Sequence, residues 1–405
     1  MSTTETRTRI LFLSGLYSTP RLPGRGVPNA RIVRAMRAHA EVRVIAPVPW
    51  YPRLVGRLSS RLRPLVELPR EEPDDDGVPV SHPRRLHPAG FPSLQAALYV
   101  VSLLRPLRAE VSRFRPEVLL SAWAYPDGTA AVALGRMLGL PTVVRVMGSD
   151  IYDFARRPRR RGQIRWALRR AHRVIAVSRG LGDEMESMGV ERDRVEIVPT
   201  GVDVRVFRPH DREEARRTHG LPPSPVILVP SRLSPEKGVS VFIDALARID
   251  ERITALVAGD GPQEAHLRAR ASQAGVLGRV RFLGFKGAET MARLYSAADL
   301  VCLPSLREGW PNALMESFAC GCPVVASAVG GVPDILALTG SGVLAPPGDA
   351  DGLARALREA LGRTWDRSAT AAIMQAHSLD ATARRYVKIC AEVVERRGVS
   401  PQGNA

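Results

Sequence analysis

Short runs of valine, isoleucine and leucine alternate with segments of helical periodicity, and this alternation occurs twice along the 405-residue chain. Continuous apolar runs of this length are typical of parallel strands that are buried on both faces. Their alternation with helical segments predicts two doubly wound α/β sheets, one after the other. The expected strands are residues 9–14, 41–47, 117–123, 142–148, 173–178 and 194–200, then 226–232, 253–261, 279–284, 299–305, 322–327 and 341–347, with helices expected at 27–39, 126–139 and 180–189.

Two domains are expected, because the chain is too long for one ordinary core. Proline, glycine and polar residues are densest around residues 208–225, where few contacts should cross between domains. We therefore predict a first domain at residues 1–207 and a second at residues 208–378. Residues 379–397 show one amphipathic helical pattern with no strand after it. Residues 379–405 are thus expected to be a C-terminal helix that could pack on either domain.

Composition limits the class of protein. With 45% apolar and 24% charged residues, the chain is typical of a folded globular protein. No apolar run approaches the roughly eighteen residues of a membrane span, and the first ten residues lack the apolar stretch of a secretory signal. A cytoplasmic protein is therefore expected, in which the cysteines stay reduced and serve packing. These cysteines are Cys302, Cys320, Cys322 and Cys390.

The net charge of +17 comes from a preference for arginine, since 55 arginines stand against three lysines. Such a one-sided preference indicates a compositional bias spread over the surface more than one groove designed for nucleic acid. Arginines are densest in residues 156–170. We expect a solvated or phosphate-facing surface there, with a nucleic-acid site as the alternative.

Polar residues follow the expected strands of the second domain. Arg232 and Lys237 stand five positions apart across a turn, and the lysine opens the next helical pattern. Two cations beside a helix amino terminus favour a diphosphate, through their charge and the helix dipole. Two solvated surface cations are the alternative. After the next strand, GDGP supplies Gly259 and Gly261, which allow close approach of the backbone.

The segment EGWPNALMESFACG separates Glu308 from Glu316 by seven residues. Glu308 is expected in a loop at the carboxyl end of a strand, and Glu316 in the first turns of the following helix. A carboxylate accepts hydrogen bonds from two neighbouring hydroxyls, so the pair suits a sugar or a ribose. Paired catalytic carboxylates of a glycoside hydrolase are the alternative. Because no GxGxxG follows the first strand, a nicotinamide-dependent enzyme is not favoured.

Taken together, these motifs resemble a known family. SRLSPEKG, GDGP, EGWPNALMESFACGCPVVAS and VGGVPD, with VSRGLGDEM and PTGVDVRVFRP upstream, are similar in order and spacing to the retaining nucleotide-sugar glycosyltransferases of family 4. The likeness spans about residues 9–361. It implies the GT-B fold, with two Rossmann-like doubly wound α/β domains that face each other across a cleft. It also implies that the C-terminal helix returns to the first domain.

The resemblance implies roles for the residues of the second domain. Arg232 and Lys237 would hold the donor diphosphate and stabilise the leaving group. Glu316 would bind the ribose hydroxyls, and Glu308 would bind hydroxyls of the transferred sugar. Backbone groups near the sugar and phosphates would come from Gly309, Trp310, Pro311 and Asn312, with Gly259 and Gly261 also counted in the donor site.

The first domain would bind the acceptor, as the resemblance implies. A glycine-rich loop after the first strand would approach the donor, here with Gly24 and Gly26. Many relatives carry a His-Gly pair after a later strand, and here Met147 stands at the histidine position, followed by Gly148. Methionine cannot replace an imidazole as a hydrogen-bond donor. Asp150 is a candidate cleft residue at the same strand end, and a helix N-cap is its alternative.

Neither a divalent metal nor a cofactor is expected. Asp74 and Asp76 have DxD spacing, but they lie in an acidic loop bounded by proline and glycine. This setting favours a solvated turn over a cation site. Cations of the protein would then serve the leaving group.

One segment suits an anionic membrane surface. Residues 50–69 space four leucines on one helical stripe with arginines around it. A basic amphipathic helix of this kind can lie on an anionic leaflet, and packing against the first domain is the alternative. The leucines are Leu54, Leu58, Leu62 and Leu65, and the arginines are Arg53, Arg57, Arg61 and Arg63.

The sequence therefore predicts a cytoplasmic, metal-independent glycosyltransferase of the hexosyltransferase type, with a peripheral place at the inner face of the membrane left open. It would move a sugar from a nucleoside diphosphate, with UDP favoured and GDP as the alternative. The acceptor would be a hydroxyl of a glycan, a lipid-linked saccharide or a small molecule, and no nucleic acid is expected as partner. Retention at the anomeric carbon comes from the resemblance. A degenerate nucleotide-sugar-binding protein, a sugar phosphorylase and a nucleotide-sugar epimerase remain alternatives.

Overall fold

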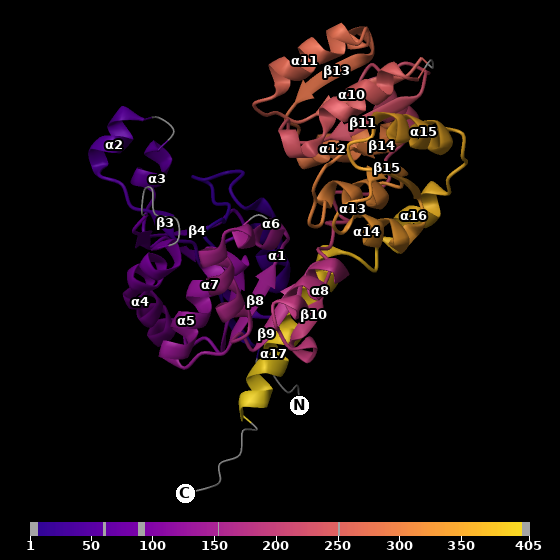
Figure 1. The fold of residues 1–405 in the computed structure, drawn as a ribbon. Helices are drawn as coiled ribbons and strands as arrows, with labels where there is room; N and C mark the ends of the chain where they lie inside the picture. The colour runs from indigo at the N-terminus through magenta and orange to yellow at the C-terminus, as the bar shows by residue number, and fades with distance from the viewer. Residues whose placement is uncertain (1–6, 60–61, 88–93, 153, 250–251, 399–405) are drawn as a thin grey trace, which may run out of the picture. The chain divides into compact units, whose positions relative to one another are not determined.

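A computed structural model describes residues 7–59, 62–87, 94–152, 154–249 and 252–398 (Figure 1). The chain forms two compact units, the first made of Met1–Pro199 together with Asp380–Ala405, and the second of Thr200–Leu379. The change from one unit to the next thus comes at Thr200, before the predicted boundary at 207/208. Val202 explains this difference, because its N–H donates to His377 O (3.1 Å) and its carbonyl accepts from Leu379 N (2.7 Å).

The first unit contains an eight-stranded sheet in the order β10-β9-β8-β7-β1-β2-β5-β4, parallel except for the β4–β5 pair. Its central strands are fully buried, which explains their unbroken apolar sequences. The strands are β1 (Arg9–Leu13), β2 (Glu41–Ile45), β4 (Glu71–Pro73), β5 (Pro79–Ser81), β7 (Val118–Ala122), β8 (Thr142–Val146), β9 (Arg173–Ala176) and β10 (Val195–Ile197).

Helices cover both faces of this sheet (Figure 1). Tyr99, Leu103 and Leu107 of one helix pack on buried residues of β1 and β7. The helices are α1 (Val27–Met36), α2 (Arg53–Leu58), α3 (Arg63–Glu67), α4 (Gln95–Phe114), α5 (Thr129–Leu138), α6 (Ser149–Tyr152), α7 (Pro158–Leu168), α8 (Arg179–Ser187) and α17 (Leu379–Gly398).

The C-terminal helix α17 packs within the first unit, where it lies beside β9 and β10 (Figure 1). Arg385 donates to Glu196 Oε2 (2.5 Å), and Tyr386 lies under the guanidinium of Arg145, 5.5 Å from its centre. His39 Nε2 is 2.8 Å from Asp380 Oδ1. These contacts come from three separate parts of the first unit and hold the first two turns of the helix.

The predicted amphipathic helix at residues 50–69 is wrong. The segment forms two short helices, because α2 ends at Leu58 and α3 begins at Arg63 with Pro64 in its first turn. Leu54 is exposed, and Leu62 and Leu65 are half-buried. The side chains of Arg57, Leu58 and Arg61 lie outside the described residues. The described leucines therefore form no continuous apolar stripe, and the argument for a membrane surface loses its basis.

The second unit contains a six-stranded, fully parallel sheet in the order β13-β12-β11-β14-β15-β16. The chain enters the sheet at the central strand β11, continues through β12 to the edge strand β13, and then adds β14, β15 and β16 on the other side of β11. This is the strand order of a Rossmann-type sheet. The strands are β11 (Val226–Pro230), β12 (Thr254–Ala258), β13 (Val280–Gly284), β14 (Leu300–Leu303), β15 (Val324–Ser327) and β16 (Gly342–Ala345).

Helices of the second unit pack in two layers. Phe242, Leu267 and Leu357, from three helices, share one core with the buried face of β11 and β12. Contacts among α9, α12, α13 and α16 form the other layer. The helices are α9 (Arg212–Thr218), α10 (Val239–Ala247), α11 (Glu264–Gln273), α12 (Ala288–Ala297), α13 (Asn312–Ala319), α14 (Val332–Thr339), α15 (Ala350–Leu361) and α16 (Arg367–Ile373).

All twelve predicted strands are confirmed, with bounds that differ by a few residues at most ends. The four cysteines are free and buried, and burial raises the pKa of each thiol, as expected for residues that serve packing. Within the described part of the chain, no helix combines the length and the apolar character needed to cross a bilayer.

Candidate functional site

The carboxyl edge of the second sheet carries the residues that the motifs single out. The sheet order places β11 beside β14, and the helices that follow these two strands, α10 and α13, belong to different layers. A crevice forms outside such a switch point, and it is where open α/β sheets bind ligands. Arg232 and Lys237 follow β11, and Glu308 follows β14. These three residues therefore flank the switch point.

Two glycines after β12 fix the backbone around Arg232. A Cβ on Gly259 would lie 2.0 Å from Ser231 O, and one on Gly261 would lie 2.4 Å from Leu233 O. Both glycines have positive φ values, +148° and +157°, which other residues rarely adopt. Leu233 N–H also donates to Asp260 O (2.8 Å). The two glycines of GDGP thus allow the backbone to pack closely against Ser231 and Leu233 of the same chain.

Lys237 ends a short 3₁₀ turn, Pro235–Lys237, just before α10. The next residue is Gly238, at φ +63°, where a Cβ would lie 2.0 Å from Pro304 O. The backbone beside Lys237 therefore rests on the loop that leaves β14. Leu306 N–H donates to Glu236 O (2.8 Å) and ties the two loops together again.

Lys237 and Glu308 form an ion pair across the switch point. Lys237 Nζ donates to Glu308 Oε1 at 2.7 Å, and Ser305 Oγ donates to the same oxygen at 2.7 Å. The Glu308 side chain is only 8% exposed, so bulk water screens this pair less than a surface pair. The predicted proximity of the cation and the acid is therefore present, although 70 residues separate them in sequence.

Contacts with Gly330, Gly331 and Thr200 hold the loop that contains Glu308. Gly330, at φ +53°, would place a Cβ 1.8 Å from Glu308 O, and Gly331 N–H donates to Gly309 O (2.9 Å). Trp310 is buried, and its indole Nε1 donates to Thr200 O at 3.1 Å. The glycines of VGGVPD are therefore needed where this segment packs against the EGWPN loop. The loop is thereby fixed before any ligand is present.

Glu316 lies in α13, which begins at Asn312 directly after Pro311, as predicted. Glu316 is half-buried, and its Oε2 accepts from Tyr295 Oη at 3.0 Å. Tyr295 belongs to α12 and is fully buried. Burial, and then the nearby Glu316 carboxylate, raise the pKa of Tyr295 well above its usual value, so the phenol stays a donor. Sequence reasoning missed Tyr295, because nothing in its segment distinguishes it from a core aromatic residue.

Arg232 remains open to solvent, with 67% of its side chain exposed. Its Nη2 donates to Glu236 Oε1 (2.7 Å), which also accepts from Ser234 Oγ (2.6 Å). The Ser234 hydrogen bond, followed by the contact with Arg232, lowers the pKa of Glu236 to about 2. Glu236 is therefore ionised at neutral pH and orients Arg232. The guanidinium keeps donors that are free to bind an anion.

The predicted residues of the first unit have different surroundings. Gly24 and Gly26, at φ +80° and +72°, lie in the loop after β1, and a Cβ on Gly26 would lie 2.2 Å from Leu16 O. Asp150 is fully buried at the end of β8. Its Oδ1 accepts from Met147 N and Gly148 N, and its Oδ2 from Ala124 N. Asp150 is not the N-cap that the alternative proposed, because it lies inside α6 and accepts from residues before the helix and from Ala124. Its carboxylate organises the turn after β8.

The solvated turn predicted for Asp74 and Asp76 is correct for one residue only. Asp76 is exposed, but Asp74 is buried. Asp74 accepts from Tyr17 Oη (2.9 Å), from Arg34 Nε (3.2 Å) and from Val78 N (2.9 Å). Its carboxylate therefore organises the β4–β5 turn. Among the described residues, no group of three or more His, Cys, Asp or Glu side chains is placed to hold a metal ion.

Two family models match the chain side by side. Residues 29–206 match the model of glycosyltransferase family 4, and residues 211–373 match that of glycosyl transferases group 1. A 2-deoxystreptamine glucosyltransferase of Streptomyces kanamyceticus is 30% identical over 59% of this chain and 65% of its own length. A D-inositol 3-phosphate glycosyltransferase of Actinosynnema mirum is 36% identical over 49% and 55%. The chain thus spans less than two thirds of these relatives.

Solved structures show the same fold over nearly the whole chain. Sucrose-phosphate synthase of Thermosynechococcus elongatus has a TM-score of 0.69 at 19% identity, and the match covers 97% of this chain and 98% of that one. Anabaena HepE in complex with UDP has a TM-score of 0.71 at 20% identity, with 95% and 100% covered. Two adjacent family matches and the shared GT-B fold show that the chain belongs to the family 4 glycosyltransferases, the glycosyl transferases group 1.

Proposed function

We propose that the protein is a glycosyltransferase that moves a sugar from a UDP-sugar to an acceptor hydroxyl, with retention at the anomeric carbon. One observation carries the proposal: the Lys237–Glu308 pair at 2.7 Å bridges the switch point of a Rossmann-type sheet, beside an exposed Arg232. A cation pair for a diphosphate and a carboxylate for hydroxyls are thus placed where such sheets bind ligands.

The relatives support this class of reaction and of donor. The curated relatives named above are a glucosyltransferase and a glycosyltransferase. HepE, which shares the fold, has been solved with UDP and glucose and with UDP-glucose. UDP is therefore the donor base to test first, and GDP the second. The acceptor differs among the relatives, so their names assign none to this chain.

Each residue of the carboxyl edge has a proposed role. Arg232 and Lys237 bind the donor diphosphate, and Glu308 binds hydroxyls of the transferred sugar while it orients Lys237. Glu316 accepts from the ribose hydroxyls, because Tyr295 holds one of its oxygens and fixes the carboxylate. Backbone groups of Gly309, Trp310, Pro311 and Asn312 line the sugar and phosphate positions.

The proposed chemical step needs no group beyond donor and acceptor. The bond between the anomeric carbon and the diphosphate oxygen breaks, and its electron pair leaves with the diphosphate towards Arg232 and Lys237. The acceptor oxygen then bonds to the anomeric carbon from the face that the diphosphate leaves. A phosphate oxygen of the leaving group takes the acceptor's proton. The two cations stabilise the charge that develops, which is worth most in a site that excludes water.

A product assay tests the proposal. The purified chain is incubated with UDP-glucose and a panel of hydroxyl acceptors, and UDP release is measured with and without acceptor. We expect acceptor-dependent release, and loss of turnover of at least about a hundredfold in the Arg232→Ala/Lys237→Ala variant. Arg363→Ala, a surface change in the same unit, is the control that should keep turnover. Unchanged turnover in the double variant would refute the assignment.

Metal independence is part of the proposal, because protein cations would neutralise the leaving diphosphate. We expect the measured turnover to persist in EDTA at a concentration that strips divalent cations. A loss of turnover in EDTA that Mg²⁺ restores would show that Arg232 and Lys237 do not suffice.

Two alternatives differ in the products they give. A degenerate binding protein would bind UDP-glucose without releasing UDP with any acceptor. A sugar phosphorylase or an epimerase would act on sugars without an acceptor hydroxyl. The relatives named above support the transferase, because they are a glucosyltransferase and a glycosyltransferase.

A further inference from the structure

The first unit buries an arginine that has no carboxylate partner among the residues that the structure describes. Arg85 belongs to the short strand β6 (Arg84–Arg85), which pairs with β3 (Val48–Pro49), and it is only 8% exposed. Its guanidinium lies 5.2 Å from the centre of the Tyr99 ring, and its Nη1 is 3.4 Å from His87 Nδ1. Its Nε is buried without a hydrogen-bond partner. Among the described residues, no carboxylate lies within ion-pairing distance of it.

A second cation, Arg25, stands near Arg85. It lies between Gly24 and Gly26, whose positive φ values turn the loop so that Arg25 Nη2 donates to Gly15 O (2.9 Å). Contacts link the two cations: Gly15 accepts from Arg25 and donates to Asp127, which accepts from Tyr99, the ring that Arg85 covers. Burial, and then the charge of Arg85, lower the pKa of Arg25. Within the described part of the chain, Arg25 too has no carboxylate at ion-pairing distance.

Asp127 lies near these cations, but it accepts hydrogen bonds from Tyr99 and Gly15 and not from either arginine. Asp127 is buried after β7, where it accepts from Tyr99 Oη and from Gly15 N (2.9 Å). Burial raises the pKa of Asp127 to about 6, although Arg85 and Arg25 oppose the shift. His82 and His87 add no charge at neutral pH, because burial and then nearby arginines lower their pKa values. The cluster therefore has two full positive charges against one carboxylate.

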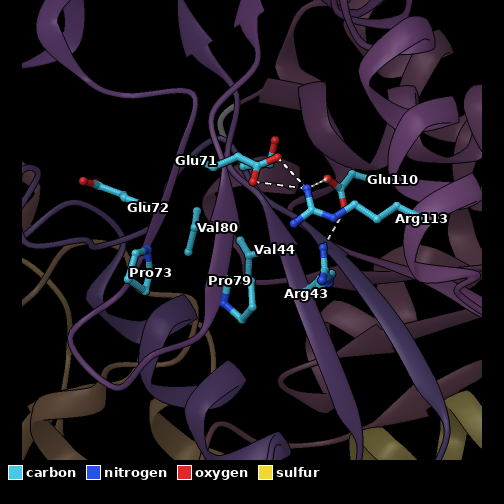
Figure 2. A pocket seen from close by; sticks show the side chains of 10 residues that line it. Arg43, Val44, Glu71, Glu72, Pro73, Pro79, Val80, Glu110 and Arg113 are labelled. Atoms are coloured by element: carbon cyan, nitrogen blue, oxygen red, sulfur yellow. Dashed lines mark hydrogen bonds and ion pairs between the residues drawn. The ribbon is translucent and has the colours of Figure 1, made fainter.

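A pocket elsewhere in the first unit is lined by arginines that each pair with an acid (Figure 2). That pocket, of about 220 Å³, is lined by two arginines and three glutamates. Arg113 donates to Glu71 Oε1 (2.8 Å), and Arg43 to Glu110 Oε2 (3.5 Å). Each of these arginines has an acid of its own. Arg85 is more buried than Arg43 or Arg113 and has none, although an unpaired buried charge is strongly unfavourable.

The place of the cluster in the fold indicates a ligand. Arg25 follows β1 and Asp127 follows β7, and these two neighbouring strands form the switch point of the first sheet. Ligands bind at such points in open α/β sheets. The backbone N–H of Trp50 donates to Arg85 O (2.8 Å) and holds β6 in place. Two cations at such a point suit a compound that carries an anionic group.

We propose that the acceptor of the transfer carries a phosphate or carboxylate group, which Arg25 and Arg85 bind at the carboxyl edge of the first sheet. This inference rests on the proposed function, because it names the class of acceptor for that reaction. A bound oxyanion supplies the missing acceptor atoms for Arg85 and the charge that the cluster lacks. The same groups reject a neutral acceptor, which would leave both cations unpaired.

Anion binding by the full chain tests the site directly. Inorganic phosphate and acetate are titrated separately by calorimetry into the wild-type protein and into Arg85→Gln, Arg25→Gln and Arg113→Gln. Arg113→Gln is the matched control, because it removes a charge that already has an acid in the same unit. We expect the dissociation constant of the preferred anion to rise at least about tenfold in Arg85→Gln and in Arg25→Gln and to stay unchanged in Arg113→Gln. The stronger of the two probes identifies phosphate or carboxylate.

Equal anion binding by all four proteins, or none by the wild type up to about 50 mM, would overturn the inference. If Arg85→Gln fails to fold, the half-buried Arg25 still decides the outcome. A second readout compares acceptors that differ only in a phosphate group. We expect the wild type to prefer the phosphorylated one at least about tenfold in kcat/KM, and Arg25→Gln to lose this preference. Equal kcat/KM values of the wild type for the phosphorylated and the neutral acceptor would contradict the proposal.

The two proposals fail in different ways. If UDP-glucose is not cleaved but the anion titration depends on Arg25 and Arg85, the anion site stands and the transferase assignment falls. If UDP is released with neutral acceptors and the anion titration shows no dependence, only the anionic acceptor falls. The titration uses no donor, so its result does not depend on turnover.

Discussion

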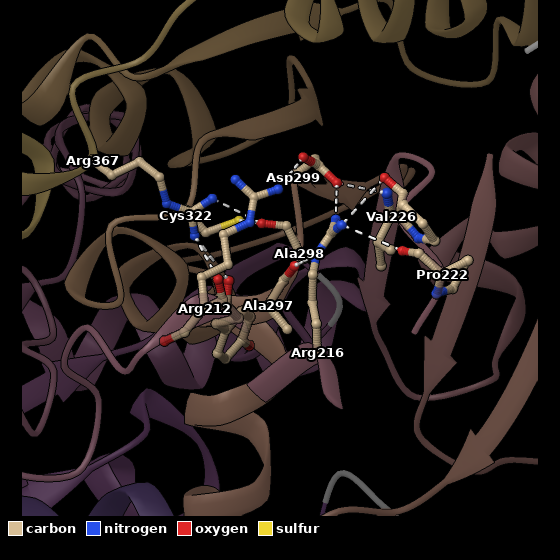
Figure 3. A network of polar contacts seen from close by, with 12 residues as sticks. Arg212, Arg216, Pro222, Val226, Ala297, Ala298, Asp299, Cys322 and Arg367 are labelled. Atoms are coloured by element: carbon tan, nitrogen blue, oxygen red, sulfur yellow. Dashed lines mark hydrogen bonds and ion pairs between the residues drawn. The ribbon is translucent and has the colours of Figure 1, made fainter. Parts of the chain in front are cut away.

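Both edges of the second sheet carry arginines and acids, but these residues have different surroundings at the two edges. At the amino edge, Asp299 directly precedes β14 and pairs with Arg216 (2.6 Å) and Arg212 (Figure 3). Asp299 also accepts from Val226 N (2.7 Å), and Arg216 Nε donates to Ala297 O (3.1 Å). At the carboxyl edge, Arg232 has one acidic partner and stays exposed. Two arginines therefore hold neighbouring segments together at the amino edge, whereas Arg232 stays exposed at the carboxyl edge.

The difference lies in how many backbone oxygens each cation serves. Arg367 donates to Ala298 O (2.8 Å), Ser296 O (3.0 Å) and Tyr295 O (3.3 Å), next to the end of α12 (Figure 3). Cations at a helix carboxyl end also neutralise the helix dipole. Arg216 is 10% exposed and Arg232 is 67% exposed. Exposure thus distinguishes Arg232 from Arg216, and neither the exposure nor the backbone partners of these arginines can be read from the sequence.

The largest expected effect is a loss of activity when a charged residue of the carboxyl edge is changed. Glu308→Gln keeps the size of the side chain but removes the charge that pairs with Lys237 across the switch point. We expect kcat/KM per folded molecule to fall roughly a hundred- to a thousandfold. The free energy of unfolding should fall by only about 1 kcal/mol, because the amide oxygen still accepts from Lys237 and Ser305. Steady-state kinetics with UDP-glucose and a denaturation curve measure the two quantities. A variant that loses its fold and keeps its specific activity would place Glu308 with the structural residues.

The reverse result is expected at the amino edge. Asp299→Ala leaves Arg212 and Arg216 without their shared acid, and the free energy of unfolding should fall by about 2–3 kcal/mol, since the carboxylate is only partly exposed. Activity per folded molecule should not change. Urea denaturation measures the loss, with Asp351→Ala as the control, because Asp351 pairs with Arg248 on the surface. A control as unstable as Asp299→Ala would remove the contrast between buried and surface pairs.

A smaller effect tests how Glu316 is positioned. Tyr295→Phe removes the hydroxyl that donates to Glu316 Oε2 and should cost about 1 kcal/mol of donor binding. The KM for UDP-glucose should then rise about fivefold, while kcat stays the same, because the ribose is bound equally in the ground state and the transition state. A fall in kcat with an unchanged KM would show that Glu316 acts on the reacting centre.

The smallest effect concerns acid stability at the carboxyl edge. Glu236 has a pKa of about 2 in the folded chain, below its usual value of 4.5, so its ionised form stabilises the fold above pH 4.5 and this contribution is lost as pH falls towards 2. Glu236→Gln should therefore be less stable than the wild type by on the order of 1 kcal/mol at pH 6 and equal to it near pH 2. Urea denaturation at both pH values measures this, and a constant difference would contradict it.

The sequence predicted the sheets well, for a physical reason. Strands such as β7 and β15 are buried on both faces, and such strands need continuous apolar residues that can be read directly. The short strands β3, β4, β5 and β6 were missed, because segments of two or three residues show no periodicity. Helix α2 ends where the leucine spacing continued, so spacing alone overestimated the length of that helix.

The site could be predicted only where its residues belong to motifs. Arg232, Lys237, Glu308 and Glu316 follow strands at recognisable spacings, and the structure places each of them at the carboxyl edge. Asp74 was misjudged, because its buried partner Tyr17 lies 57 residues away. Nothing in the sequence distinguishes Arg85 among 55 arginines, since its lack of a carboxylate partner among the described residues is a property of the fold. The arrangement of the two units about a shared cleft stays a prediction.

Hydrogen exchange with and without saturating UDP tests the central claim most directly, because it needs no variant. If the carboxyl edge binds the nucleotide diphosphate, amide exchange should slow in residues 231–238, 259–263 and 305–316. Residues 212–216 and 362–367 at the amino edge should exchange as before. Slower exchange confined to the amino edge, or no change in the three carboxyl-edge segments while UDP is bound, would contradict the account.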